Sequence, residues 1–83
     1  MNRLNKCEVQ IVLFGQLTDI AGNNTIAVND VPDTDALIKA INQLYPAMSD
    51  VKYVIAVDKK IIRLNVILTE NSEVALLPAF SGG

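Results

Sequence analysis

The sequence contains no histidine and no tryptophan, and its only cysteine is Cys7. Without histidine there is no Ser–His pair, no histidine general base and no histidine metal site. One cysteine can form neither an internal disulfide nor a multi-cysteine zinc site, and no glycine-rich phosphate loop is present. We therefore expect no autonomous catalysis and no bound metal or cofactor. The chain is expected to carry or bind something instead.

Charge and long apolar runs are also scarce. Charged residues make up 19% of the chain and the net charge is −2, which argues against nucleic-acid binding through a basic patch. No apolar run reaches the roughly 18 residues of a transmembrane helix, and residues 1–6 lack a signal-peptide core. We expect no membrane association, a loose segment at residues 1–6 and, with a lone cysteine, a reducing cytoplasmic location.

Apolar residues make up 51% of the 83 residues, which is enough for a single small domain spanning residues 1–83. Runs rich in β-branched residues predict strands at residues 7–14, 25–28, 53–57, 61–62 and 73–77. The first run carries apolar side chains on both faces. It is therefore expected to be a central strand that is covered on much of both sides.

One helix is predicted over residues 34–45, where apolar side chains recur at helical spacing. Asp33 is placed to accept hydrogen bonds from the first free amides, and Pro46 ends the helix. Residues 15–22 are expected to form a connection with one helical turn, residues 47–52 a connector and residues 63–67 a loop or short extended piece.

Three polar turns are expected. Gly22, followed by two asparagines, can supply the positive φ of a tight turn, and Asn71 is the best candidate for a left-handed residue within 68–72. The turn at Asp58 carries Lys59 and Lys60, which form either a solvated turn or a docking patch. The order of elements predicts an α+β fold, a β-grasp (ubiquitin-like) roll. Its mixed sheet has four to five strands, one main helix and an exposed C-terminal tail.

The last stretch of the sequence, Leu76 to Gly83, is apolar, contains a proline and ends in Gly82-Gly83. Glycines bring no side-chain bulk, so such an end suits a narrow slot in another protein better than a core. We expect residues 78–83 to be a flexible functional tail and the terminal carboxyl of Gly83 to be the reactive group. The alternative is a frayed end or a cloning remnant.

Four segments carry a family resemblance: VQIVLFGQLTDIAG, the helix start DTDAL, the hairpin AVDKKII and, above all, LTENSEVALLPAFSGG. Together they resemble the MoaD/ThiS-type ubiquitin-like family, to which the small, sulfur-carrying subunit of molybdopterin synthase belongs. The sequence departs from the family where Asn71-Ser72 stands for Gly-Asp, Leu76-Leu77 for a Phe pair, Ala79 for a second proline and Phe80 for a small aliphatic residue.

The resemblance implies a mechanism centred on Gly83. An E1-like activating enzyme uses ATP to adenylate its carboxyl group, and a persulfide-type donor converts it to a thiocarboxylate. The sulfur then passes to the pterin precursor, cyclic pyranopterin monophosphate, in molybdenum cofactor biosynthesis. The chain is the non-catalytic subunit of this sulfurtransferase complex. The large subunit supplies the catalytic side chains, in an expected heterotetramer of two small and two large subunits.

The resemblance also gives the rest of the tail a role in partner binding. Gly82 lets the tail pass a narrow channel, and Pro78 stiffens the exit from the last strand. Ala79 and Ser81 are expected to contact the partner. Phe80 either anchors the tail in a partner pocket or folds back over its own sheet.

Three other functions remain open. The chain could carry sulfur for thiamine or another metabolite, because the activating chemistry is shared. It could be a ubiquitin-like protein modifier, in which Gly83 forms an isopeptide bond with a lysine. It could also be a plain β-grasp interaction module in which Gly-Gly has no function.

Overall fold

The structure, a computed structural model, describes residues 8–79. The helices are α1 (Gln16–Ala21) and α2 (Thr34–Leu44), with a short 3-10 helix, η1 (Pro46–Asp50). The strands are β1 (Glu8–Leu13), β2 (Thr25–Asn29), β3 (Tyr53–Val57), β4 (Lys60–Ile62) and β5 (Val74–Pro78). All five predicted strands and the main helix are therefore confirmed, each within one residue of its expected bounds.

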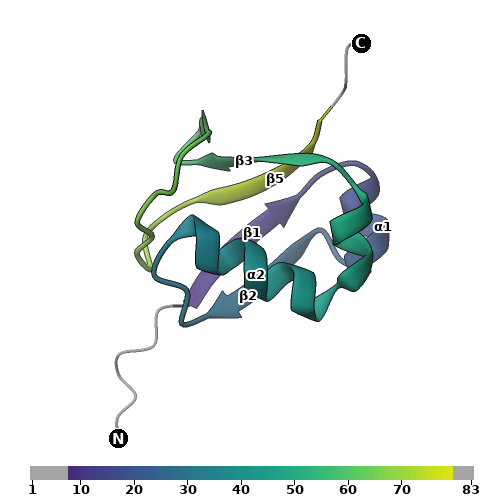
Figure 1. Ribbon diagram of the computed structural model, residues 1–83, viewed down its shortest axis with the longest axis horizontal. Coiled ribbons are helices and arrows are strands. Elements are labelled where there is room, and N and C mark those ends of the chain that lie inside the picture. Colours follow the sequence, from purple (N-terminus) through teal and green to yellow (C-terminus); the bar gives the residue numbers. More distant parts are fainter. Residues whose placement is uncertain (1–7, 80–83) are drawn as a thin grey trace, which may run out of the picture.

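The five strands form one sheet in the order β2-β1-β5-β3-β4. β1 and β5 run parallel, whereas every other neighbouring pair is antiparallel. Figure 1 shows the last strand, β5, lying between β1 and β3 in the middle of the sheet. This mixed sheet with one main helix is the predicted β-grasp roll. β5 therefore ends in the middle of the sheet.

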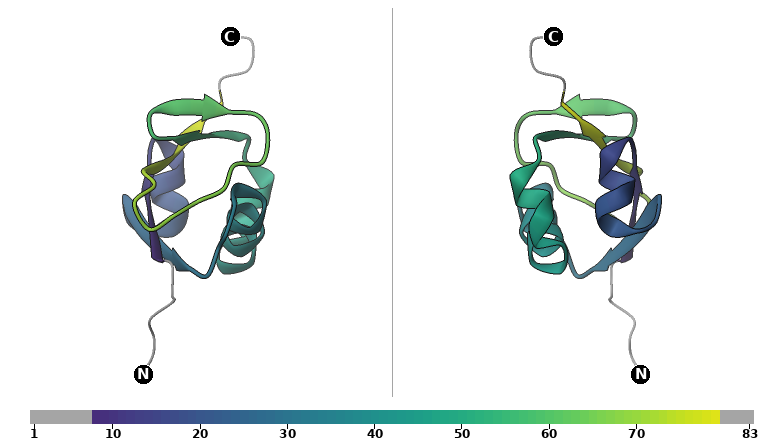
Figure 2. Two further views of the ribbon diagram at one scale, coloured as in Figure 1. Left: turned by 90° about the vertical axis from the view of Figure 1, so that its left-hand side faces the viewer. Right: turned by 90° about the vertical axis from the view of Figure 1, so that its right-hand side faces the viewer.

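Helix α2 covers one face of the sheet, which we call the inner face (Figure 2). Its start is fixed as predicted, because the Ala36 amide donates to the Asp33 carboxylate at 2.9 Å. Leu37 and Ile41 are fully buried. The helix ends at Leu44, one residue before the expected end, since the residue before a proline is disfavoured in the α region.

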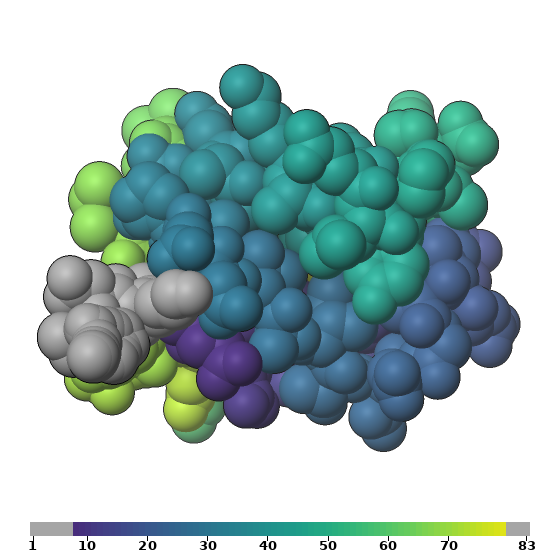
Figure 3. Space-filling view, turned by 90° about the horizontal axis from the view of Figure 1, so that it is seen from below, coloured from purple at the N-terminus to yellow at the C-terminus, as the bar shows by residue number. Residues whose placement is uncertain are grey.

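The expected connector after α2 contains η1, a short 3-10 turn that the sequence pattern did not predict. The Met48 amide donates to the Tyr45 carbonyl at 2.8 Å, and the Met48 side chain is fully buried. This turn therefore fills the core at the C-terminal end of α2. The space-filling view shows α2 and β2 side by side along another face of the molecule (Figure 3).

β1 is central in the strand order, as expected, but only its inner face is covered. Val9, Ile11 and Leu13 are buried, whereas Val12 is 42% exposed and Phe14 is 46% exposed. The prediction of two covered faces is wrong, because the helices pack against the inner face only. The apolar side chains of the other face, which we call the outer face, remain exposed.

The left-handed residues differ from the prediction. Asn71 does not have a positive φ, because the Ser72 amide donates to the Thr69 carbonyl at 3.0 Å and closes a turn that needs no left-handed residue. Asp58 and Lys59 do, at 52° and 72°, as a two-residue hairpin of the primed type requires. Gly22 has a φ of 79°, as expected. Among residues 8–79 the other positive-φ positions are Gly15 and Asp30.

Candidate functional site: the exit of the C-terminal tail

The predicted site lies at the end of β5. Of its residues, Pro78 and Ala79 are described by the structure, whereas Phe80, Ser81, Gly82 and Gly83 lie outside the described residues. The site can therefore be built from the base of the tail. We call this base, together with the residues that hold it, the tail exit.

Pro78 belongs to β5, one residue beyond the predicted end of the strand, and pairs with Tyr53 of β3. Its lack of an N–H costs no ladder hydrogen bond. The Leu76 carbonyl faces β1, where it accepts from the Phe14 amide at 3.1 Å, and groups two residues apart in a strand face the same neighbour. The Pro78 nitrogen therefore faces the place where β1 has already ended. A proline is tolerated at such a position.

On the opposite side the base of the tail is tied to β3. The Ala79 amide donates to the Lys52 carbonyl at 3.1 Å, which continues the pairing of β5 with β3 by one residue. Ala79 is half-buried. Two of the six residues assigned to the flexible tail are therefore held by the sheet.

Gly15 lies against Pro78 and was not predicted as a site residue. It follows the end of β1 with a φ of 60° and a ψ of −140°, a backbone conformation that side chains strongly disfavour. A Cβ atom at this position would lie 2.7 Å from the Pro78 Cγ. The sequence shows only that a glycine opens the connection to α1. The contact itself joins two residues that are far apart in the chain.

A hollow of about 510 Å³ lies beside the tail exit on the inner side. Ile38, Met48, Tyr53 and Ala79 contribute to its wall. Burial raises the pKa of the Tyr53 phenol above its ordinary value, because the charged form loses solvation. Asn42, Ser49 and Lys52 also line the hollow, so its wall combines apolar and polar groups.

The outer face near the exit is also apolar. The register aligns Val12, Ala75, Ala56 and Ile61 in one row across β1, β5, β3 and β4. The two alanines lie between larger side chains, and a hollow of about 370 Å³ opens at this place, which we call the alanine hollow. Its full lining is Gln10, Val12, Phe14, Ala56, Lys59, Ser72, Glu73, Val74 and Ala75.

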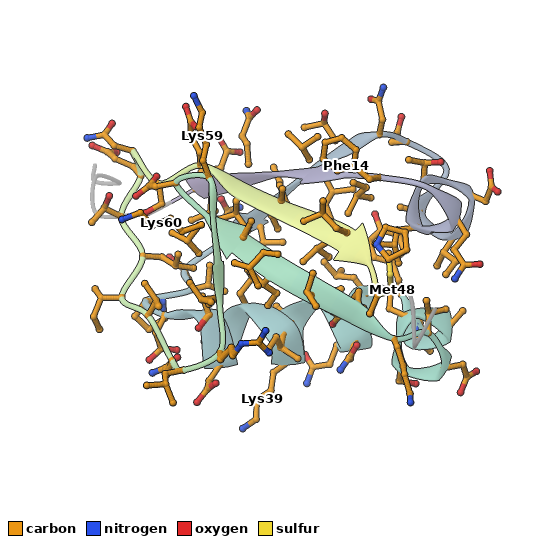
Figure 4. All side chains as sticks on the ribbon, turned by 90° about the horizontal axis from the view of Figure 1, so that it is seen from above. Phe14, Lys39, Met48, Lys59 and Lys60 are labelled. Atoms are coloured by element: carbon orange, nitrogen blue, oxygen red, sulfur yellow. The ribbon has the colours of Figure 1, made fainter. Side chains whose placement is uncertain are left out.

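The alanine hollow lies between two chemically different ends of the sheet. Figure 4 shows Phe14 near the end of β5, whereas Lys59 and Lys60 lie at the opposite end of this strand. Both lysines are exposed, as expected of a solvated turn. Phe14 therefore borders the tail exit on the outer face, and the pair of lysines lies at the far end of the hollow.

Neither a metal nor a membrane site is apparent in the part of the chain that the structure describes. Between residues 8 and 79, no group of three or more acidic, cysteine or histidine side chains is placed to hold a metal ion. In the same range no helix has both the length and the apolar character needed to cross a membrane.

The chain was compared with protein-family models. The model described as the ThiS family matches residues 11–83, which is most of the chain and includes the terminal glycines. A search of curated proteins found no match.

Several solved structures share the fold. The small archaeal modifier protein 1 from Methanosarcina acetivorans has a TM-score of 0.79 at 22% identity, over 95% of this chain and 99% of that protein. The protein of the same name from Haloferax volcanii has a TM-score of 0.75 at 24% identity, over 92% and 99%. A Pyrococcus furiosus protein, provisionally named molybdopterin converting factor, subunit 1, has a TM-score of 0.79 at 16% identity, over 89% and 99%. At these identities the likeness shows the fold alone.

Proposed function

The chain belongs to the ThiS family of ubiquitin-like sulfur carriers, and from this premise we propose that it is the sulfur-carrying small subunit of a molybdopterin synthase. The observation that carries the sulfur-carrier role is the family match, which runs through the last strand and the tail to Gly83. The choice of molybdopterin is supported by the resemblance of LTENSEVALLPAFSGG to the small subunit. Carriers of this family are non-catalytic subunits. The tail exit supports the same role, because it holds Pro78 and Ala79, the base of the tail, at the end of the central strand β5.

The first step of the proposed reaction activates the carboxyl group of Gly83. A carboxylate is a poor electrophile, so an E1-like partner transfers AMP from ATP to it and releases pyrophosphate. The product is an acyl-adenylate, whose carbonyl has a good leaving group. No cofactor is bound by the carrier itself, and ATP is the substrate of the partner. The need for ATP makes the cytoplasm the location that the proposal implies.

The second step exchanges oxygen for sulfur. The terminal sulfur of a donor persulfide attacks the Gly83 carbonyl and AMP leaves, which gives an acyl disulfide. A second thiol then attacks the donor sulfur of this disulfide. The S–S bond breaks, the two thiols become a disulfide, and the thiocarboxylate of Gly83 is released. Each loaded carrier thus consumes one ATP, one persulfide sulfur and one thiol.

In the third step the sulfur passes to the pterin precursor inside the large subunit. The thiocarboxylate sulfur bonds to a carbon of the precursor and displaces an oxygen substituent, which leaves with a proton, and water then cleaves the bond between this sulfur and the Gly83 carbonyl. Oxygen returns to the carrier and sulfur stays on the product. Holding the tail in a slot makes this transfer effectively intramolecular. We propose that Gly82 and Ser81 contact the walls of the slot and that Phe80 anchors the tail in the partner. We also propose that two small and two large subunits assemble.

The outer face gives this partner a place to dock. Val12 and Phe14 are each more than 40% exposed and border the alanine hollow next to the tail exit. A large subunit or activating enzyme that receives the tail must approach within the reach of five residues, at most about 17 Å from Pro78. We propose that its surface meets the apolar outer face beside the exit.

Intact mass after incubation with the activating enzyme, ATP and a sulfur source tests the proposal. We expect the mass gain of one oxygen replaced by sulfur, mapped to Gly83. A variant lacking Gly83 should fold normally and gain nothing, whereas deletion of Asn2, the matched control at the other end, should load like the parent. Sulfur on the variant without Gly83 would contradict the mechanism. So would an unloaded parent when the activating enzyme is competent on another carrier.

A second function is favoured by the names of two structural neighbours. Both are called small archaeal modifier proteins, and a protein modifier would use the same activated Gly83 to acylate a lysine. Conjugates of higher mass on a gel, formed after activation and dependent on Gly83, would favour this function. Formation of the dithiolene product from the pterin precursor and the large subunit would favour molybdopterin synthesis over both this function and a thiamine-type carrier.

A further inference from the structure

The contact between Gly15 and Pro78 has a consequence for how the tail is presented. We propose that Gly15 is a positioning residue: its bare Cα seats the Pro78 ring and so sets the place and direction in which residues 79–83 leave the sheet. The proposal rests on the proposed function in one respect, that the tail must reach a partner's active site.

Pro78 lies beside the point where β1 has ended. β1 runs parallel to β5 until the bond from the Phe14 amide to the Leu76 carbonyl, and the chain then turns away at Gly15 into α1. The Pro78 ring lies at this turn, in contact with the Gly15 backbone. On its other side β5 is tied to β3 through the Tyr53 pairing and the Ala79 amide. The base of the tail is thus held between the turn at Gly15 and β3.

A side chain at residue 15 cannot fit without moving Pro78 or the turn. The distance from an added Cβ to the Pro78 Cγ would be 2.7 Å, about 1 Å less than the optimal separation of two carbon atoms. The proline side chain closes onto its own backbone nitrogen, so it cannot rotate away as a flexible side chain can. We propose that the base of the tail yields by shifting toward β3, where the 3.1 Å bond from the Ala79 amide to the Lys52 carbonyl lies.

The expected change is in KM, because the carrier contacts its partner through its body and through its tail at the same time. When the body of the carrier sits on its partner, a displaced base must be bent back for the tail to enter the slot. This cost is the same before and during the reaction, so it raises KM and leaves kcat unchanged. Misplacement by about 1 Å can cost up to 100-fold, and we expect Gly15→Ala to raise the KM for sulfur loading by about tenfold or more.

Gly22→Ala is the matched control. Gly22 lies at the other end of α1 and also has a positive φ, 79°, but an added Cβ would meet nothing within 4 Å. Both substitutions lower stability through backbone strain. Only Gly15→Ala also places an atom against the tail exit, so Gly22→Ala should load with the KM of the parent.

A second substitution separates the contact from the strain. Pro78→Ala removes the ring atoms that a Cβ at residue 15 would strike, but it leaves the positive φ of that residue unrelieved. The double variant Gly15→Ala/Pro78→Ala should therefore load with the KM of Pro78→Ala alone, a non-additive result expected of residues in contact. A double variant as impaired as Gly15→Ala would show that strain, not the contact, causes the defect, and would overturn the proposal.

Hydrogen exchange tests the positioning without any partner. The Ala79 amide should exchange faster in Gly15→Ala, relative to the Asp58 amide, whose bond to the Glu73 carbonyl lies at the other end of the sheet. Gly22→Ala should leave this ratio unchanged. An unchanged ratio in Gly15→Ala would refute the positioning role whatever the loading assay gives. If the parent protein fails to load sulfur, the proposed function fails, and the exchange ratio still decides the role of Gly15.

Discussion

The two faces of the sheet carry side chains of different size on the same strands. On the inner face Leu13, Leu76 and Ile55 are neighbours across β1, β5 and β3, and all three are buried under the helices. One residue away, the outer row carries two alanines at the corresponding positions of β5 and β3. On these central strands the inner face carries large side chains, whereas the outer face carries alanines on β5 and β3.

This difference separates stability from recognition. Burying large aliphatic side chains supplies most of the folding free energy, so the inner face fixes the β-grasp roll. The outer alanines contribute little to the core, but they leave an apolar hollow next to the tail exit. Because side chains alternate along a strand, β5 contributes to the core with one set of residues and to the alanine hollow with the other. The same strand also leads into the tail.

The largest effect should come from truncating the inner face. The Leu76 side chain lies in the core with 0% of its surface exposed, whereas its neighbour Leu77 is half-buried on the outer face. Leu76→Ala should lower the free energy of unfolding by about 2–5 kcal/mol, because it leaves a cavity. Leu77→Ala is the matched control and should cost less than half as much. Urea unfolding measures both, and equal losses would contradict the division between the faces.

A charge in the alanine hollow should affect binding more than stability. Ala75→Glu places a carboxylate among apolar groups that a partner would have to desolvate. We expect the dissociation constant for the activating enzyme to rise about tenfold or more, which equals about 1.4 kcal/mol. Ala27→Glu, the same change on the outer side of β2, should bind like the parent. Isothermal titration calorimetry measures both, and unchanged binding by Ala75→Glu would remove the hollow from the docking surface.

The fold was predictable because each element has a local cause. Asp33 caps α2, the residue before Pro46 cannot continue it, and β-branched runs mark the strands. What the pattern could not show is which side of β1 the helices would cover. An apolar residue such as Val12 fits a buried face and an exposed docking face equally well.

The candidate site was predictable only as a segment. The sequence indicates a tail that begins near Pro78, but it places this proline outside the last strand. Its real position depends on β1 ending beside it, which is a tertiary feature. Gly15 was missed for the same reason, since a glycine after a strand is ordinary until the proline that packs against it is known.

A smaller loss of stability should follow from removing the N-cap of α2, the helix that covers the inner face. The Asp33 carboxylate accepts from the Ala36 amide at 2.9 Å at the start of α2. Asp33→Ala should lower the free energy of unfolding by about 1 kcal/mol, and Asp33→Asn, which keeps an acceptor, by only a few tenths. Thermal unfolding ranks the two variants. Equal losses would mean that charge, not the cap hydrogen bond, stabilises the helix start.

The smallest effect concerns Tyr53, where the inner face meets the tail exit. Burial raises the pKa of its phenol above the ordinary value of 10.0, so the folded protein holds this proton more tightly than the unfolded chain does. The stabilisation is complete below about pH 10 and is lost as the pH rises through the raised pKa. Urea unfolding across this range should show a loss of stability that Tyr53→Phe abolishes, because phenylalanine has no proton to release. The same decline in Tyr53→Phe would assign it to another group and would contradict the burial of the Tyr53 phenol as its cause.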